Sequence, residues 1–229
     1  GTHDSATYNA YWYQLYGCTQ NFYIKDQLNI GCRFLDIRLK LESGSFECYH
    51  GIWDMHLNFE DIAEVCEDFL NQNPNECILM SVKNEGENGK DFNDQFFSLI
   101  NLKYSNLFYV GNEIPTIGNV RKKIVLIRRF GLPSTLTYYG LDFTEIPGNS
   151  SGHFELNQTQ TAYVEDLYSP PRSNSQKIKQ NAIAANIALA RKNSSPDNMY
   201  LTFTSWTLEP WTPRGLALPT NSWLISTVF

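Results

Sequence analysis

Apolar segments of strand length recur along the 229-residue chain, and they constrain its fold more than any other feature. The segments span residues 32–39, 45–50, 77–83, 123–130, 163–166 and 199–205. Several are rich in Val, Ile, Leu and Phe without a strict alternation of apolar and polar residues. This composition indicates strands that are covered on both faces, as in parallel sheets.

Helical patterns separate several of these segments. In residues 58–73 the apolar side chains fall on one face of a helix, and Asn58 at its start is suited to be the N-cap. Further helices are predicted over residues 21–31, 93–102 and 174–193. Strands that alternate with helices indicate a parallel α/β fold.

Residues 131–162 interrupt this pattern. The stretch is polar, contains Gly and Ser, and has no helical period. We predict a long loop here, which either counts against a regular fold or serves function.

Charged or titratable side chains lie at the C-terminal ends of the predicted strands. They are Arg38, His50, Lys83, the neighbours Arg128 and Arg129, and Asp166. In a (β/α) barrel the carboxyl ends of the parallel strands meet at one rim, where active sites form. The sequence therefore predicts an irregular TIM-type (β/α) barrel. His3 and Asp4 fit this arrangement only if a strand precedes them, so we expect a barrel truncated at both ends, without its first and last strands.

Length and composition narrow the classes of protein. The chain has no linker and no internal repeat, which predicts a single domain over residues 1–229, and 42% hydrophobic residues supply its core. A formal net charge of -6 argues against a nucleic-acid partner. No apolar run approaches the roughly 18 residues that a membrane-spanning helix requires.

The cysteines match no zinc motif, because no CxxC pair is present. Cys32, Cys66 and Cys77 lie within apolar patterns, which favours buried free thiols. A link between Cys32 and Cys48 on neighbouring strands is left open.

The histidines His3 and His50, several cations, and the lack of a serine or thiol nucleophile motif indicate acid–base chemistry on an anion. Phosphoryl transfer fits this set, because Arg and Lys stabilise the charge that develops on phosphate oxygens. One histidine can accept the proton of an attacking hydroxyl, and the other can protonate the leaving oxygen. Histidine suits both roles because its ordinary pKa is roughly 6.5.

Several motifs in order resemble the X-type catalytic domain of phosphatidylinositol-specific phospholipases C, and in particular the bacterial, metal-independent branch. They are GTHDS (1–5), GCRFLDIRL (31–39), YHG (49–51), PNECILMSVKNE (74–85), KKIVLIRRF (122–130), VEDLY (164–168) and LTFTS (201–205). The similarity covers nearly the whole chain and is strongest over residues 1–85 and 120–130.

The resemblance implies cleavage of phosphatidylinositol to diacylglycerol and inositol 1,2-cyclic phosphate. His3 would be the general base that deprotonates the inositol 2-hydroxyl, and His50 the general acid for the diacylglycerol oxygen. Arg38 would bind the phosphate, and Asp36 would help to position that site. Asp4 matches the aspartate that follows the first histidine.

The resemblance also implies the residues that bind inositol. Lys83, Arg129 and Asp166 match groups that hydrogen-bond inositol hydroxyls, and Tyr168 matches the aromatic residue on which the ring stacks. Charged partners and one apolar wall suit a ring of hydroxyls. Of Arg128 and Arg129 only one side chain can point inward, because side chains alternate along a strand.

No metal and no other cofactor is expected. In the calcium-dependent relatives the position that matches Arg38 is acidic and helps to hold the ion. An arginine places fixed positive charge where the cation would lie and removes an oxygen ligand. The family's C-terminal aspartate, which orients the first histidine, has no counterpart before Phe229.

Aromatic residues follow two of the predicted rim segments. They are Tyr11, Trp12, Tyr13 and Tyr16 after the first catalytic loop, and Trp206 and Trp211 after the last predicted strand. Amphipathic rings suit a membrane interface, so we expect Tyr16, Trp206 and Trp211 to contact a membrane surface. The alternative is that the tryptophans pack the end of the barrel.

The leading interpretation is a secreted, monomeric, peripheral enzyme that cleaves phosphatidylinositol lipids. Glycosyl-phosphatidylinositol anchors are an alternative substrate within the same chemistry. A catalytically weak protein that only binds inositol lipids is a second class, against which the two histidines argue. A barrel phosphodiesterase acting on glycerophosphodiesters is a third, but it would rely on acidic metal ligands.

Overall fold

The structure is a computed structural model that describes residues 1–9, 16–87 and 89–227. Tyr11, Trp12 and Tyr13 lie outside the described residues. The chain forms two compact units, residues 1–144 and 145–229, and each unit has a sheet of its own. The single domain over residues 1–229 stays a prediction.

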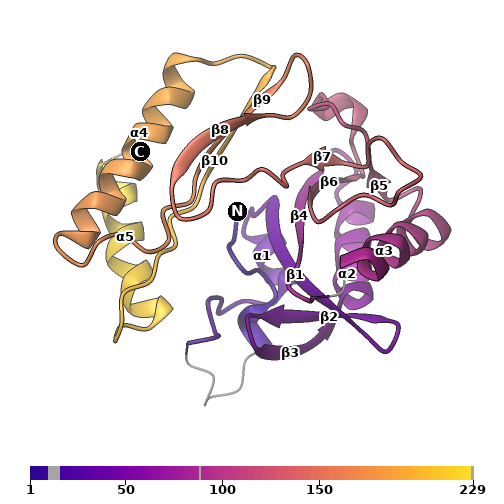
Figure 1. Cartoon of the computed structure of the whole chain (residues 1–229), viewed down its shortest axis with the longest axis horizontal. Helices are drawn as coiled ribbons and strands as arrows, with labels where there is room; N and C mark the ends of the chain where they lie inside the picture. The colour runs from indigo at the N-terminus through magenta and orange to yellow at the C-terminus, as the bar shows by residue number, and fades with distance from the viewer. Residues whose placement is uncertain (10–15, 88, 228–229) are drawn as a thin grey trace. The chain divides into compact units, whose positions relative to one another are not determined.

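The first unit is built on a seven-stranded sheet with the order β3-β2-β1-β4-β6-β5, and β7 also pairs with β6 (Figure 1). Its strands are β1 (Phe34–Glu42), β2 (Ser45–His50), β3 (Trp53–Asn58), β4 (Ile78–Asn84), β5 (Phe108–Tyr109), β6 (Ile124–Arg129) and β7 (Leu141–Asp142). Strands β1, β4, β6, β5 and β7 run parallel to one another, whereas β2 pairs antiparallel with both β1 and β3. The sheet is therefore mixed.

The connection between β1 and β2 explains the antiparallel part. Ser43 and Gly44 have φ angles of 50° and 86°, and two successive residues with positive φ are typical of the turn that closes a tight hairpin. Strand β2 therefore returns alongside β1, with Cys48 opposite Leu39. The prediction of a parallel strand over residues 45–50 is wrong in direction, because two residues cannot connect parallel neighbours.

Three α-helices cover the first unit: α1 (Ile24–Asn29), α2 (Phe59–Gln72) and α3 (Gly89–Lys103), with short 3-10 turns at Thr7–Asn9 and Ile117–Asn119. The predicted cap of α2 is confirmed, because Oδ1 of Asn58 accepts a hydrogen bond from the N–H of Asp61 at 2.9 Å. Helices α2 and α3 lie on the same side of the sheet (Figure 1). Phe59 from α2 and Phe96 from α3 meet with ring centroids 5.0 Å apart, and this aromatic cluster forms the core beside the sheet.

The second unit contains a three-stranded sheet in the order β10-β9-β8. Its elements are β8 (Ser151–Glu155), β9 (Thr161–Glu165), α4 (Ser175–Lys192), β10 (Asn198–Thr202) and α5 (Pro213–Thr227). Strands β9 and β10 are parallel, and α4, the helix predicted over residues 174–193, packs against both. Helix α5 was not predicted, since its sequence carries Pro219 in the interior.

The long loop predicted over residues 131–162 is wrong in part. Strands β7 and β8 lie within it, and β7 adds a parallel strand next to β6 through the pairing of Ile127 with Leu141. With strands of two and five residues, this stretch offered too little periodicity to be recognised.

The α/β class is confirmed. Within the described residues the hydrogen bonds do not close either sheet, so the barrel stays a prediction. None of the described helices combines the length and apolarity needed to cross a bilayer.

The cysteines are free thiols in this structure. Cys48 and Cys66 are buried, whereas Cys32 and Cys77 are only partly covered, so the expectation of burial is wrong for these two. A link between Cys32 and Cys48 is excluded. Cys48 lies opposite Leu39 in the sheet, whereas Cys32 precedes Phe34, the first residue of β1. Phe34 and Leu39 are five residues apart, or about 16 Å at roughly 3.3 Å per residue, which is too far for a disulfide.

Candidate active site

The N-terminal segment lies beside β1. Thr2 forms a parallel bridge with Leu35, and the N–H of Ser5 donates to the carbonyl of Asp36 at 2.8 Å. In return, the N–H of Asp36 donates to Oγ of Ser5 at 2.8 Å. These bonds hold the two residues between Thr2 and Ser5 next to the start of β1.

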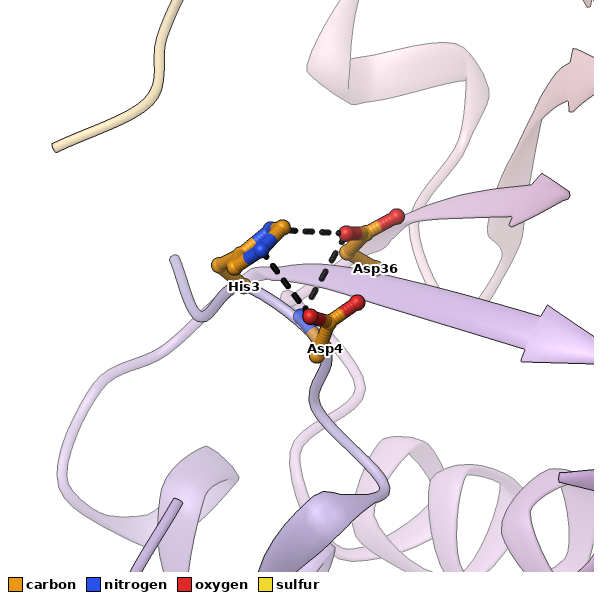
Figure 2. A group of neighbouring side chains, drawn as sticks. All are labelled: His3, Asp4 and Asp36. Atoms are coloured by element: carbon orange, nitrogen blue, oxygen red, sulfur yellow. Dashed lines mark hydrogen bonds and ion pairs between the residues drawn. The ribbon is translucent and has the colours of Figure 1, made fainter. Parts of the chain in front are cut away.

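His3 lies between two carboxylates (Figure 2). Its Nε2 is 2.9 Å from Oδ2 of Asp4, and its Nδ1 is 3.0 Å from Oδ2 of Asp36. A carboxylate oxygen only accepts, so both ring nitrogens carry protons when both contacts are hydrogen bonds. Burial lowers the pKa of His3, but the charge of Asp4 and the hydrogen bonds that His3 donates to both carboxylates outweigh it and raise this pKa to about 9.

Asp4 joins the two candidate catalytic histidines. Its Oδ2 is also 3.3 Å from Nε2 of His50, and its Oδ1 pairs with Nε of Arg38. Its backbone has a φ of 47°, which Asp tolerates better than most residues. Burial raises the pKa of this carboxyl group, but the charges of His3 and Arg38 outweigh it, and the net shift is downward.

His50 approaches from β2. Its Nδ1 is 3.0 Å from the carbonyl oxygen of Gly17, so Nδ1 carries the hydrogen in this contact. The other nitrogen, Nε2, faces Asp4. Nε2 is therefore the atom of His50 that is placed to exchange a proton.

Three cations lie side by side on neighbouring parallel strands. The register pairs Arg38 with Lys83 on β4, and Lys83 with Arg129 on β6. Nη1 of Arg129 is 3.5 Å from Oδ1 of Asp36, and the buried Nε of Arg129 has no hydrogen-bond partner among the described residues. The structure thus brings together the three cations that the sequence placed at one edge. Arg38 does not end its strand, however, because β1 continues to Glu42.

Arg128 makes its contacts elsewhere. Its Nε donates to the carbonyl of Tyr139 at 3.0 Å, and its other nitrogens bond the carbonyl of Phe130 and the carboxylate of Asp142. Arg129 is therefore the member of the pair that faces the histidine cluster, and Arg128 joins β6 to the segment that contains β7.

Two residues of the site were missed by sequence reasoning. Oε1 of Glu85 is 2.7 Å from Nζ of Lys83 and 3.3 Å from Nη1 of Arg38. Oγ of Ser81 donates to Oδ1 of Asp36 at 3.3 Å. Ser81 could have been found from the alternation of side chains along a strand, because it lies two residues before Lys83 and therefore on the same face of β4.

Asp166 and Tyr168 lie in the turn that follows β9, in the second unit. The N–H of Asp166 donates to the carbonyl of Ser150 at 3.0 Å, and the carbonyl of Tyr168 accepts the N–H of Thr207 at 2.7 Å. The Tyr168 side chain is exposed. The cluster described in the first unit does not include these two residues.

The candidate interfacial residues differ from one another. Tyr16 and Trp211 are exposed by 57% and 59%. Trp206 is buried, and its Nε1 donates to Oγ1 of Thr220 at 3.0 Å. The predicted interfacial role of Trp206 does not fit this position, and the packing alternative holds for it.

The residues with metal-binding atoms do not favour a cation. Among the described residues, His3, Asp4 and Asp36 each bring one such atom within 4.8 Å of the others. Arg38 already pairs with both carboxylates. Because the pKa of His3 is about 9, its nitrogens hold protons rather than free lone pairs at neutral pH.

A carboxylate shared by two histidines, beside Arg38 and two further cations, defines a site for acid–base chemistry on an anion. Residues 3–130 match the family described as "Phosphatidylinositol-specific phospholipase C, X domain". The chain belongs to this family.

Two curated relatives carry the name 1-phosphatidylinositol phosphodiesterase. The protein from Listeria monocytogenes is 30% identical over 233 residues, which cover 97% of this chain and 67% of the relative. The protein from Staphylococcus aureus strain Newman is 28% identical over 222 residues, which cover 90% of this chain and 69% of the relative. The chain spans about two thirds of the length of these relatives.

Solved structures show the same fold. The phosphatidylinositol-specific phospholipase C from Listeria monocytogenes superposes with a TM-score of 0.80 at 28% identity, covering 100% of this chain and 80% of that one. A Staphylococcus aureus enzyme with incorporated pentafluoro-Phe gives 0.86 at 24% identity with the same coverage. Another Staphylococcus aureus structure, described in terms of modulation of membrane binding, gives 0.84.

Proposed function

We propose that the chain is a phosphodiesterase that cleaves phosphatidylinositol to diacylglycerol and inositol 1,2-cyclic phosphate. The observation that carries the proposal is the position of Asp4, whose Oδ2 lies within 3.3 Å of both His3 and His50 while its Oδ1 pairs with Arg38. Family membership and the names of the relatives support the same reaction.

His3 is the general base in this proposal. Asp36 holds the Nδ1 proton, so the base is the neutral form of His3, whose Nε2 has released its proton to solvent. Nε2 then takes the proton of the inositol 2-hydroxyl. The freed oxygen attacks phosphorus to form the cyclic diester. The bond from phosphorus to the diacylglycerol oxygen breaks, and Nε2 of His50 protonates that oxygen. Arg38 stabilises the charge on the phosphate oxygens.

The inositol ring binds beside this centre. Lys83 and Arg129 donate to its hydroxyls. Nε of Arg129, which is buried without a hydrogen-bond partner in the described part of the chain, supports this role, because buried donors are rarely left unsatisfied. The family resemblance assigns two further inositol contacts to residues of the second unit: Asp166 as an acceptor from hydroxyls, and Tyr168, whose side chain is exposed, as the ring that stacks on inositol. Glu85 lies between the two cations of β1 and β4 and keeps their side chains in place.

The enzyme is proposed to need no metal, since Arg38, and the His3 imidazolium that forms when Nε2 takes the hydroxyl proton, supply the positive charge of the site. Tyr16 and Trp211 are the exposed aromatic residues proposed to contact the membrane surface. The scaffold is proposed to be an irregular (β/α) barrel. A secreted location and a monomeric state remain part of the proposal.

Phosphorus NMR tests this function directly. Wild type, incubated with phosphatidylinositol in the presence of a chelator, is expected to produce a cyclic inositol phosphate. His3→Ala and His50→Ala are expected to slow its formation at least ~10²-fold, the usual contribution of one acid or base. His56→Ala is the matched control, because His56 is exposed and its Nδ1 lies 3.3 Å from Oδ2 of Asp54, which belongs to neither the acid nor the base.

Full-rate formation of the cyclic product by both active-site variants would sink the mechanism. Wild type that binds phosphatidylinositol vesicles without turnover would favour the binding protein instead. Release of glycosyl-phosphatidylinositol anchors at a higher rate would assign the alternative substrate.

A further inference from the structure

A fully buried ion pair lies in the second unit. Nζ of Lys179 is 2.9 Å from Oε1 and 3.1 Å from Oε2 of Glu165, and neither side chain is exposed. Burial raises the pKa of Glu165 and lowers the pKa of Lys179, which shows how strongly this environment disfavours each charge. An ion pair so deeply buried is weak as a source of stability, so another reason for its presence is needed.

The side chain of Glu165 also bonds to the chain beyond β9. Its Oε1 accepts the N–H of Leu167 at 3.1 Å. The residues on either side of Leu167 are Asp166 and Tyr168, the two proposed inositol-binding residues of this unit. The N–H of Tyr168 donates to the carbonyl of Asp166 at 2.9 Å, so this stretch forms a tight turn around Leu167.

Lys179 is anchored independently of the turn. It lies on α4, and Asn186 of the same helix donates to the carbonyl of Leu201 at 3.0 Å and to Oγ1 of Thr202 at 2.9 Å, both on β10. Lys179 therefore holds the Glu165 carboxylate from a helix that is itself bonded to the sheet. A carboxylate held at both oxygens presents a fixed acceptor to Leu167.

We propose that Glu165 and Lys179 are positioning residues that set the inositol-binding turn of Asp166 and Tyr168 through the N–H of Leu167. This inference rests on the proposed function. It adds two residues that touch no substrate and act through the backbone. Its consequence is a specific effect on inositol binding, distinct from any effect on folding.

Two double variants separate the acceptor from the charges. Glu165→Gln with Lys179→Met removes both charges and keeps an oxygen for the Leu167 N–H. Glu165→Leu with Lys179→Met removes both charges and that oxygen. Because each variant removes the complete pair, neither leaves an uncompensated buried charge that would unfold the protein.

The readouts are KM and kcat for a water-soluble inositol phosphodiester and amide hydrogen exchange at Leu167. The leucine double variant is expected to exchange faster at Leu167 and to have a KM about five- to tenfold above that of the glutamine double variant, as for one lost hydrogen bond. The two kcat values are expected to agree within about twofold, since the acid, the base and the phosphate ligand are untouched.

Equal KM values in the two double variants would overturn the proposal, and so would faster exchange at Leu167 without a change in KM. If wild type does not cleave the diester, the proposed function fails on its own. The dissociation constant of myo-inositol, measured by NMR titration, then replaces KM, and equal values in the two variants again overturn the positioning role.

Discussion

Nδ1 of His3 lies 3.0 Å from Oδ2 of Asp36, a completely buried carboxylate near the start of β1. Ser81 and Arg129 hold its other oxygen, at 3.3 Å and 3.5 Å. Burial raises the pKa of Asp36, but the charges of Arg38 and His3 and the hydrogen bond from His3 outweigh it and hold this pKa well below its usual range. Asp36 is therefore a fixed anion at neutral pH, and its orientation sets that of the imidazole.

Replacing Asp36 with Asn is expected to lower the pKa of His3 from about 9 toward the ordinary value near 6.5. The substitution removes a negative charge and a hydrogen bond that both favour the imidazolium. An NMR titration of the His3 ring measures this shift. Asp54→Asn is the control, because Asp54 faces the exposed His56 at 3.3 Å and should leave His3 unchanged. An unaltered His3 titration in Asp36→Asn would contradict the assignment.

The free energy of unfolding is expected to depend on pH because the pKa of His3 is raised in the folded protein. The pKa of His3 is higher in the folded protein than in the unfolded chain, so protonated His3 stabilises the fold fully below pH 6.5, and this contribution is lost as the pH rises through about 9. In His3→Gln the contribution is absent. Urea unfolding of both proteins at several pH values should give a stability difference that shrinks from pH 6 to pH 10, and a constant difference would refute the argument.

The neighbours Arg128 and Arg129 are expected to respond differently to replacement by Met. Arg128→Met should lower the free energy of unfolding by about 1–3 kcal/mol, because it leaves the carbonyl acceptors of Tyr139 and Phe130 without their buried donor. Arg129→Met should mainly raise KM for a soluble inositol phosphodiester. Denaturant unfolding and steady-state kinetics on both variants test this division of roles, and the reversed pattern would exchange them.

Replacing Trp206 is expected to affect mainly stability, and replacing Trp211 is expected to affect mainly membrane binding. Trp206→Ala should lower the unfolding free energy by about 3–5 kcal/mol, since it removes a buried ring and its bond to Thr220. Trp211→Ala should leave stability nearly unchanged and reduce sedimentation with phosphatidylinositol vesicles. Full vesicle binding by Trp211→Ala would remove this residue from the membrane contact.

Removal of divalent metals is expected to leave the rate of phosphatidylinositol cleavage unchanged. Arg38 pairs with Asp4 and Asp36, the two carboxylates that a cation would need. Activity measured after dialysis against a chelator, and again after calcium is added back, provides the test. A loss that calcium restores would show that the ion takes part despite the guanidinium.

The cationic part of the site could be predicted from the positions of charged residues near the ends of apolar segments, because such positions are visible in the local sequence. Arg38, Lys83 and Arg129 each end a recognisable apolar segment, and parallel neighbours place those ends together. His50 reaches the same place by a route that was not predicted. It lies at the end of a strand that runs antiparallel to β1 after the Ser43–Gly44 turn. The apolar pattern of a strand does not reveal its direction.

Other features were beyond sequence reasoning because they depend on contacts between distant residues. The shared contacts of Asp4 require a backbone with positive φ and two histidines that are 47 residues apart in the chain. The burial of Trp206 depends on α5, whose interior proline hid the helix. The short strands β7 and β8 are recognised through their partners rather than their own sequences.

The pairing of Arg38, Lys83 and Arg129 across β1, β4 and β6 makes the length of these strands as important as their composition. Inserting or deleting one residue within β6 before Arg129 would turn that side chain to the opposite face and leave Arg128 or Phe130 in its place. Substitutions elsewhere in the strands keep the alignment and can be tolerated when volume is conserved. Homologous sequences should therefore differ freely in loop length between these strands while the number of residues within each strand up to its cation stays constant.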